Sequence, residues 1–199
     1  MSSPQPTRPL PPSELRGHGL LLRAWDPDSA DDADAWLRGL TDPEFRRWNT
    51  PLRPVDDLAG ARRSLRARVA LAEEGSTLSF HVADDTDGTP LGHIGIQDIH
   101  PVMRVGRIGY WVLPEARGRG VATRAVLLAA HWALTEGALH RLELGHAIGH
   151  EASCRIATRC GFLPEGTLRD AMFAPDRHDA FRDTHLHARL ATDREPAGP

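Results

Sequence analysis

Apolar and polar residues follow one another in patterns that predict a mixture of helices and strands. Apolar residues spaced three and four apart, as at Leu58, Ala61 and Leu65, predict a helix over 55–72. Short apolar runs predict strands, and the polar turn at 84–88 makes two of them a hairpin. The predicted strands are 20–25, 78–83, 91–99, 107–113, 141–146, one that begins at 162, and 181–190. The other predicted helices are 28–40, 43–48, 122–136 and 153–160.

Several boundaries carry signals of their own. Asp42 followed by Pro43 is typical of a helix N-cap and first helical position. Gly137 and Gly161 predict the ends of the helices that precede them. Because the order contains hairpins and only one or two crossover helices, it predicts an α+β domain.

Composition limits the classes of protein that fit. The 199 residues suit one domain, which we place at 14–191. We expect both flanking segments, a Pro-rich leader at 1–13 and a polar tail at 192–199, to be disordered. A net charge of −3 gives no reason to expect nucleic acid or an anionic membrane as partner. The leader lacks the apolar core of a secretory signal, and no apolar run reaches the roughly 18–20 residues that span a bilayer. We therefore expect a cytoplasmic monomer or homodimer.

The two cysteines, Cys154 and Cys160, lie six residues apart on a predicted helix. At that spacing the side chains point to different faces, so we expect no disulfide. Unpaired thiols suit a reducing compartment. Since no activating partner is evident nearby, we do not expect a catalytic cysteine.

The segment 114–121 stands between a predicted strand and a predicted helix and carries Arg117, Gly118, Arg119 and Gly120. A helix N-terminus presents free N–H groups and the positive end of the helix dipole. Glycines allow the backbone to approach a ligand, and the arginines add fixed positive charge. Together these features predict a cradle for pyrophosphate.

Other motifs fit this segment less well. A P-loop needs Lys followed by Ser or Thr, and a dinucleotide fingerprint needs a third glycine where Thr123 stands. The stretch 117–122 instead is similar to the acetyl-CoA signature Q/R-x-x-G-x-G/A of the GNAT acyltransferases. An exposed basic turn before an ordinary helix is the alternative that the motif alone leaves open.

Four segments in order resemble GNAT N-acetyltransferases, and especially the RimJ/RimL-like subgroup that acetylates the N-termini of ribosomal proteins. They are the opening strand 20–25, the strand and loop 108–120, the N-x-A-S…G-F-like element at 150–153 with 160–162, and the E-G-x-x-R-like element at 165–169. The likeness covers roughly 15–190. It implies a twisted mixed sheet whose two central parallel strands splay apart, flanked by helices in three layers, with the pantetheine arm of acetyl-CoA between those strands.

The resemblance also implies the residues that bind the cofactor. Backbone groups of Val112 and Leu113 are expected along the pantetheine arm, and the amides of 117–122, with the Thr123 hydroxyl, along the pyrophosphate. His150 stands where the family usually has an Asn that contacts the pantetheine amide, which leaves the acyl preference open. The predicted cofactor-binding residues are Val112, Leu113, Arg117, Gly118, Arg119, Gly120, Val121, Ala122, Thr123 and His150.

Acetyl transfer to an amine needs a base, stabilisation of an oxyanion, and a proton for the leaving thiolate. By resemblance, strand N–H groups near Val112 and Leu113 serve the oxyanion, and His146 stands where some relatives have a general-base Glu. Its alternative role is to end a strand and bond a neighbouring carbonyl. Ser153 matches the subgroup's partner for the thiolate, with helix capping as the alternative. The general-acid Tyr of some members is replaced by Ala157.

No metal is expected. His146 and His150 lie four apart, but Gly149 and the lack of an intervening Glu argue against a zinc helix. His185 and His187 alternate on the last predicted strand, and we interpret them as surface or packing residues.

The sequence therefore predicts an acetyl-CoA-dependent N-acetyltransferase that modifies a primary amine. The subgroup likeness favours a protein or peptide N-terminal α-amine, and a small-molecule amine, including an antibiotic, is the alternative. The acceptor is expected to contact the segments 42–54 and 169–180. Two rivals remain: a non-catalytic acyl-CoA-binding module, and a nucleotide-binding domain that uses the same loop.

Overall fold

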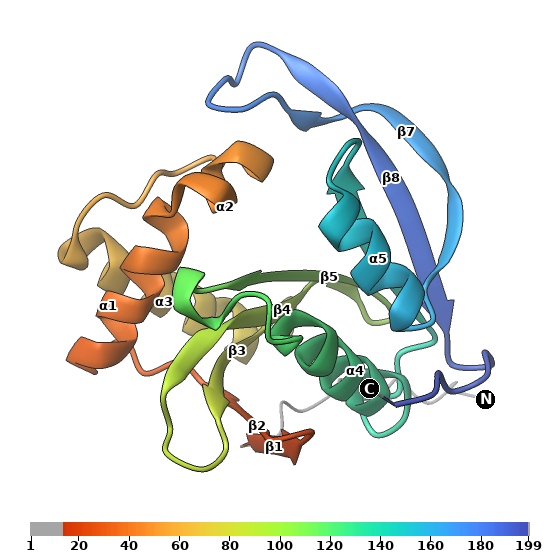
Figure 1. Cartoon of the computed structure of the whole chain (residues 1–199), viewed down its shortest axis with the longest axis horizontal. Helices are drawn as coiled ribbons and strands as arrows, with labels where there is room; N and C mark the ends of the chain where they lie inside the picture. The colour runs from red at the N-terminus through yellow and green to blue at the C-terminus, as the bar shows by residue number, and fades with distance from the viewer. Residues whose placement is uncertain (1–13, 199) are drawn as a thin grey trace, which may run out of the picture.

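The structure is a computed structural model that describes residues 14–198 and shows one eight-stranded sheet covered by helices (Figure 1). The leader predicted over 1–13 lies outside the described residues. The strands are β1 (Glu14–Gly17), β2 (Leu20–Ala24), β3 (Leu78–Asp84), β4 (Pro90–His100), β5 (Val105–Val112), β6 (Arg141–Ala147), β7 (Leu163–Phe173) and β8 (Phe181–Leu190). The helices are α1 (Ala30–Thr41), α2 (Pro43–Trp48), α3 (Leu58–Glu73), α4 (Val121–Leu134), α5 (Glu151–Arg159) and the short 3-10 helix η1 (Pro114–Ala116).

The strand order is β1-β2-β3-β4-β5-β6-β8-β7, and β5 and β6 are the parallel neighbours in this sheet. Their pairing runs from Val105 and Arg141 to Ile108 and Leu144 and then stops. Both strands continue beyond that point, β5 to Val112 and β6 to Ala147. The two central strands therefore part within the sheet, which confirms the predicted α+β fold with splayed parallel strands.

The two faces of the sheet carry different cores because alternate residues of a strand point to opposite sides. Ile108, Tyr110 and Val112 of β5 pack in the cluster that includes α4. Trp111 packs in a second cluster with Trp36 of α1 and with α3. Helices thus cover both faces of the sheet. Helices α4 and α5 lie on the same face, the one to which Ile108, Tyr110 and Val112 point.

Some boundaries differ from the prediction. The helix expected from 55 begins at Leu58, because the Asp57 carboxylate accepts a hydrogen bond from the Gly60 N–H at 2.5 Å and so caps it. Strand β1 was missed, and the helix expected from Ser153 begins at Glu151. Strand β7 runs on to Phe173, into the segment 169–180 that is expected to contact the acceptor.

Residues 192–198, the described part of the tail, contain no helix or strand, but they contact the rest of the domain. Glu195 accepts a hydrogen bond from the buried Arg189 guanidinium at 2.5 Å, and its other oxygen lies 3.1 Å from His131 Nδ1. A composition-based prediction of disorder could not foresee this contact, because it depends on a buried charge elsewhere in the fold. Among residues 14–198, none of the helices has the length and apolar character to cross a bilayer.

Candidate acetyl-transfer site

A cavity of about 470 Å³ opens where β5 and β6 part. Both strands, the 117–120 loop and the first turn of α4 line it, and α2 and α5 close its sides. The predicted site residues that line it are Val112, Arg117, Gly118, Gly120, Val121, Ala122, Thr123, His146, His150 and Ser153. Leu113 and Arg119 are not among its lining residues.

The glycines of the loop hold it in a conformation that suits an anion. Gly118 and Gly120 both have φ of 72°, a left-handed conformation that side-chain-bearing residues rarely adopt. Gly120 is also the N-cap of α4, and no side chain caps that helix. The first N–H groups of α4, at Val121, Ala122 and Thr123, are therefore free to bind a ligand at the positive end of the helix dipole. The geometry fits the predicted pyrophosphate cradle.

The side chain of Arg117 has partners within the protein. The Arg117 guanidinium pairs with the Asp42 carboxylate, and its Nε donates to the Val112 carbonyl at 3.1 Å. Asp42 also caps α2, accepting from the Phe45 N–H at 2.9 Å. The guanidinium of Arg117 therefore fastens the loop to α2, and the charge expected beside the pyrophosphate is already paired. Only its backbone remains a candidate for ligand binding.

The backbone groups of Leu113 also have partners within the protein. Its N–H donates to the Leu91 carbonyl on β4 at 2.9 Å, and its carbonyl accepts from the Ala116 N–H at 2.9 Å. Both backbone groups are thus used within the protein. Since successive residues of a strand turn their backbone groups to opposite edges, the Val112 N–H faces the side from which β6 has parted. Val112 is the better candidate for contact with the pantetheine arm and the oxyanion.

Ser153 faces a tyrosine that the sequence analysis did not place in the site. The Tyr110 hydroxyl donates to Ser153 Oγ at 3.0 Å, and both residues line the cavity. Burial raises the pKa of Tyr110 to about 12, so the hydroxyl stays protonated at neutral pH. Ser153 does not cap α5, whose N-cap is His150. The alternation of Tyr110 with Val112 on β5 was the signal that could have found this residue.

His146 lies at the end of β6 with its ring buried. Its Nδ1 is 3.1 Å from the Ala147 carbonyl, and its Nε2 is 3.2 Å from Nε2 of His187. Burial lowers the pKa of His146, so the ring is neutral at pH 7. The ring bonds a neighbouring carbonyl, as one of the two alternatives expected, and it also lines the cavity, where its role as a base stays a prediction.

His150 is held by a stacking contact. Its ring lies parallel to that of Trp48, with 4.4 Å between centroids and 3° between planes. Burial and the neighbouring His146 lower the pKa of His150 to about 4, which makes it a neutral hydrogen-bonding group. His150 therefore lies beside the cavity as expected, with α2 supplying a wall that the sequence did not reveal.

The two segments expected to meet the acceptor lie against each other. Figure 1 shows the connection between β7 and β8 reaching toward α2. Thr50 Oγ1 donates to the Ala174 carbonyl at 2.9 Å and accepts from the Asp176 N–H at 3.1 Å. From these segments Glu44, Phe45, Trp48, Asn49 and Met172 line the cavity.

Comparison with known protein families identifies the family to which these segments belong. The model of the acetyltransferase (GNAT) domain matches residues 19–163. The chain belongs to the GNAT family. The match contains the splayed strands, the loop at 117–120 and the first turns of both α4 and α5, so the family and the cavity rest on the same segments.

Several relatives of this GNAT chain are RimJ/RimL-like, which confirms the predicted subgroup likeness. Ribosomal-protein-serine acetyltransferase of Escherichia coli (strain K12) is 28% identical over 65% of this chain and 69% of that protein. YdaF of Bacillus subtilis (strain 168) is 35% identical over 46% of this chain, and the match spans only half of YdaF. RimJ of Mycobacterium smegmatis, solved in complex with CoA-disulfide, has a TM-score of 0.78 and 26% identity, over 92% of this chain and 88% of that one.

Proposed function

We propose that this chain is an acetyl-CoA-dependent N-acetyltransferase that acts on a primary amine. One observation carries the proposal: the uncapped N-terminus of α4 and the parted edges of β5 and β6 open into the same cavity. The first suits a pyrophosphate, and the second offers unpaired strand edges to an extended, amide-containing arm. Coenzyme A contains both groups, and the related RimJ was solved with a CoA disulfide.

The favoured acceptor is the N-terminal α-amine of a protein or peptide, because relatives include a ribosomal-protein-serine acetyltransferase. The wall formed by α2 supports an amine acceptor, since Glu44 places a carboxylate at the cavity. Cationic amines are attracted by such a charge. A small-molecule amine is the alternative acceptor, and only a substrate panel separates the two.

The side chains of the cavity fit the roles that transfer requires. When bound, acetyl-CoA supplies an acetyl group activated as a thioester. His146, neutral and basic, takes up the proton of the amine. The Val112 N–H faces the negative charge that develops on the acetyl oxygen. Tyr110 and Ser153 form a hydroxyl pair that donates a hydrogen bond toward the departing sulfur.

Coenzyme A is expected to raise the melting temperature of the protein. A ligand that binds only the folded state stabilises it by mass action, by about 2.7 kcal/mol at a hundred times its Kd. A thermal-shift measurement with CoA, acetyl-CoA, ATP and NAD checks this. Protection by ATP or NAD without protection by CoA would establish the nucleotide-binding rival, and no shift at millimolar CoA would refute the cofactor assignment.

Turnover separates an enzyme from a module that only binds acyl-CoA. The measurement is release of free thiol from acetyl-CoA with a panel of peptides that carry different N-terminal residues, and with polyamines and aminoglycosides as small-molecule acceptors. We expect release to depend on a peptide with a free α-amine, and an N-acetylated copy of the same peptide is the matched control. Binding of acetyl-CoA without release on any acceptor would favour the module.

Ser153→Ala and Tyr110→Phe are each expected to lower kcat about tenfold. This is roughly the effect of losing one charge-assisted hydrogen bond in the transition state. Because the two hydroxyls are linked at 3.0 Å, the double variant should be little slower than the slower single variant. CoA affinity should change little, and melting curves on the same preparations control for folding. Effects on kcat that multiply in the double variant would show that the two hydroxyls act separately.

A further inference from the structure

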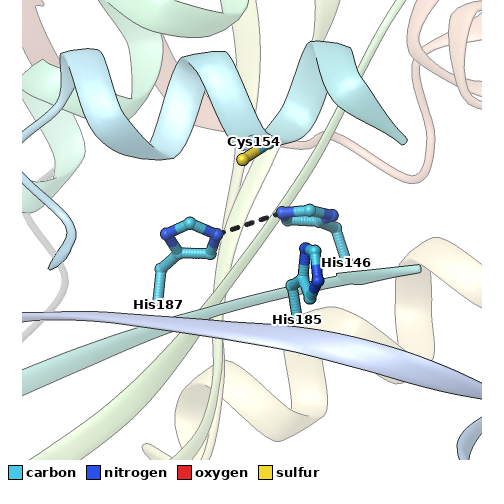
Figure 2. A group of neighbouring side chains, drawn as sticks. All are labelled: His146, Cys154, His185 and His187. Carbon is cyan, nitrogen blue, oxygen red and sulfur yellow. Dashed lines mark hydrogen bonds between the residues drawn. The ribbon is translucent and has the colours of Figure 1, made fainter. Parts of the chain in front are cut away.

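Three histidines and a cysteine from β6, β8 and α5 lie close together, as Figure 2 shows. One of them, His146, also lines the cavity. His146 of β6 lies opposite His185 of β8 in the strand register, and His187 follows two positions along β8. Cys154 points down from α5 toward the three rings. One ligand atom from each residue lies within 4.8 Å of all the others. These residues, His146, Cys154, His185 and His187, form the histidine–cysteine cluster.

The sequence analysis treated these residues differently. It rejected a metal at His146 and His150, and it interpreted His185 and His187 as surface or packing residues. Strand β8 instead lies between β6 and β7, and His187 is buried. The partners of His146 come from β8 and α5, so no spacing along the chain could have revealed them.

The hydrogen bonds of the two buried rings are incomplete. His146 Nδ1 donates to the Ala147 carbonyl, which leaves its Nε2 with a lone pair directed at His187 Nε2, 3.2 Å away. Nδ1 of His187 has no hydrogen bond of ordinary geometry among the described residues, although the Phe162 carbonyl lies close by. Whichever nitrogen of His187 carries the proton, one buried ring nitrogen therefore lacks a partner. Unpaired buried polar atoms are rare and costly, and a bound ion is one way to explain them.

The donor set identifies the class of ion. Imidazole and thiolate together suit Zn²⁺, and tetrahedral coordination by Cys and His is its usual structural arrangement. Metal–ligand bonds of about 2.0–2.3 Å give a tetrahedron with edges of about 3.3–3.8 Å. The 3.2 Å between His146 and His187 already matches such an edge. The longest separation, up to 4.8 Å, closes by about 1 Å through rotation of the half-buried Cys154 and His185 side chains.

We propose that the histidine–cysteine cluster is a Zn²⁺ site in which His146, His185, His187 and Cys154 are the four ligands. The Nδ1–H of His146 bonded to the Ala147 carbonyl fixes the tautomer that presents Nε2 to a metal. Cys154 ligates as the thiolate, so binding of each ion releases the Cys154 proton to solvent.

One consequence rests on the proposed acetyl transfer. An ion on His146 Nε2 occupies the lone pair that accepts the proton of the amine. Zn²⁺ therefore inhibits transfer, and the enzyme is active when the cluster is free of metal. This links catalysis to the availability of the metal through one shared atom.

Titration of the reduced, full-length protein with Co²⁺ tests the site without any need for an acceptor. Tetrahedral Co²⁺ has intense visible ligand-field bands, and a thiolate ligand adds a charge-transfer band in the near ultraviolet. We expect both bands at one Co²⁺ per chain, and their loss when Zn²⁺ is added. Weak octahedral bands, or no bands, in the unaltered protein would overturn the proposal.

Variants assign the bands to residues. Cys154→Ser should remove the charge-transfer band. Loss of a residue that only supports a metal ligand lowers metal affinity about 10–100-fold. His187→Phe removes a proposed ligand itself, so it should lower the affinity for Co²⁺ by more than that. The matched controls are Cys160→Ala, at a cysteine that lies on α5's C-cap and outside the cluster, and His100→Ala, at an exposed histidine. Circular dichroism verifies folding of each variant. Charge-transfer absorption that survives Cys154→Ser but disappears in Cys160→Ala would overturn the assignment.

The inhibition is measured separately, as thiol release with and without Zn²⁺. Cys154→Ser should retain the metal-free rate and need more Zn²⁺ for half-inhibition than the unaltered protein. Equal inhibition of the two proteins would overturn the link to the cluster. If the spectra show the site but no acceptor supports turnover, the acetyl-transfer proposal fails and the metal site stands.

Discussion

Replacement of Gly120 by glutamate is expected to abolish CoA binding while the domain stays folded. A Cβ at Gly120 meets no atom within 4 Å, so the new side chain fits without a clash. Its carboxylate lies at the uncapped N-terminus of α4, where it bonds the free N–H groups and repels a phosphate. We expect CoA affinity, measured by calorimetry, to fall by at least about a hundredfold, or about 2.8 kcal/mol.

The chain offers a matched control for this change. Gly88, in the β3–β4 turn, has φ of 75° against 72° at Gly120, and a Cβ there also meets nothing within 4 Å. Gly88→Glu therefore imposes the same left-handed strain, about 1–2 kcal/mol, far from the cavity. It should lower the melting temperature as Gly120→Glu does and leave CoA binding intact. Gly120→Gln separates charge from bulk and should bind CoA better than Gly120→Glu. Tight CoA binding by Gly120→Glu would show that the loop is not the cradle.

The loop was predictable because its information is local. The strand before it, the glycines within it and the helix after it are consecutive, and each depends on neighbouring residues. The same holds for the Asp42 cap and Pro43 at the start of α2, which the structure confirms. The type of each element and the glycine-rich turn before the uncapped start of α4 therefore follow from the sequence.

Side-chain partners that lie far apart in the chain were not predictable. Arg117 pairs with Asp42, 75 positions away, and its place in the loop gave no sign of this partner. Tyr110 meets Ser153 across 43 positions, because β5 and α5 border one cavity. Long-range pairs of this kind are set by sheet order and by the packing of helices on it, and no local pattern encodes either one.

The histidines show the same limit most clearly. Alternation on β8 correctly placed His185 and His187 two positions apart on one strand, but it gave no information about the neighbouring strand. Only the pairing of β6 with β8 brings His146 opposite them. His146, for which the sequence left a base and a structural role open, thus has ring partners on β8 that the sequence did not reveal.

Replacement of His146 by alanine is expected to lower kcat by about 10²–10⁴-fold, the usual cost of losing a general base. The KM for acetyl-CoA should change far less, since His150 and the α4 N-terminus remain. Because burial lowers the pKa of His146, the unaltered enzyme keeps a neutral base as pH falls toward 6.5, and it loses activity only when pH passes below the lowered value. The variant, in contrast, depends on amine that has lost its proton in solution, so its rate should rise with pH toward the pKa of the acceptor.

Steady-state kinetics across pH, in the presence of a chelator, give the measurement. The chelator matters because bound Zn²⁺ would mask His146 in the unaltered enzyme and reduce the difference between the two proteins. His100→Ala, at the exposed histidine that ends β4, is the control and should retain full activity at every pH. If His146→Ala matches the unaltered rate at neutral pH, His146 has a structural role only. The proton of the amine would then leave through solvent or through His150, the other histidine that lines the cavity, whose pKa burial lowers to about 4.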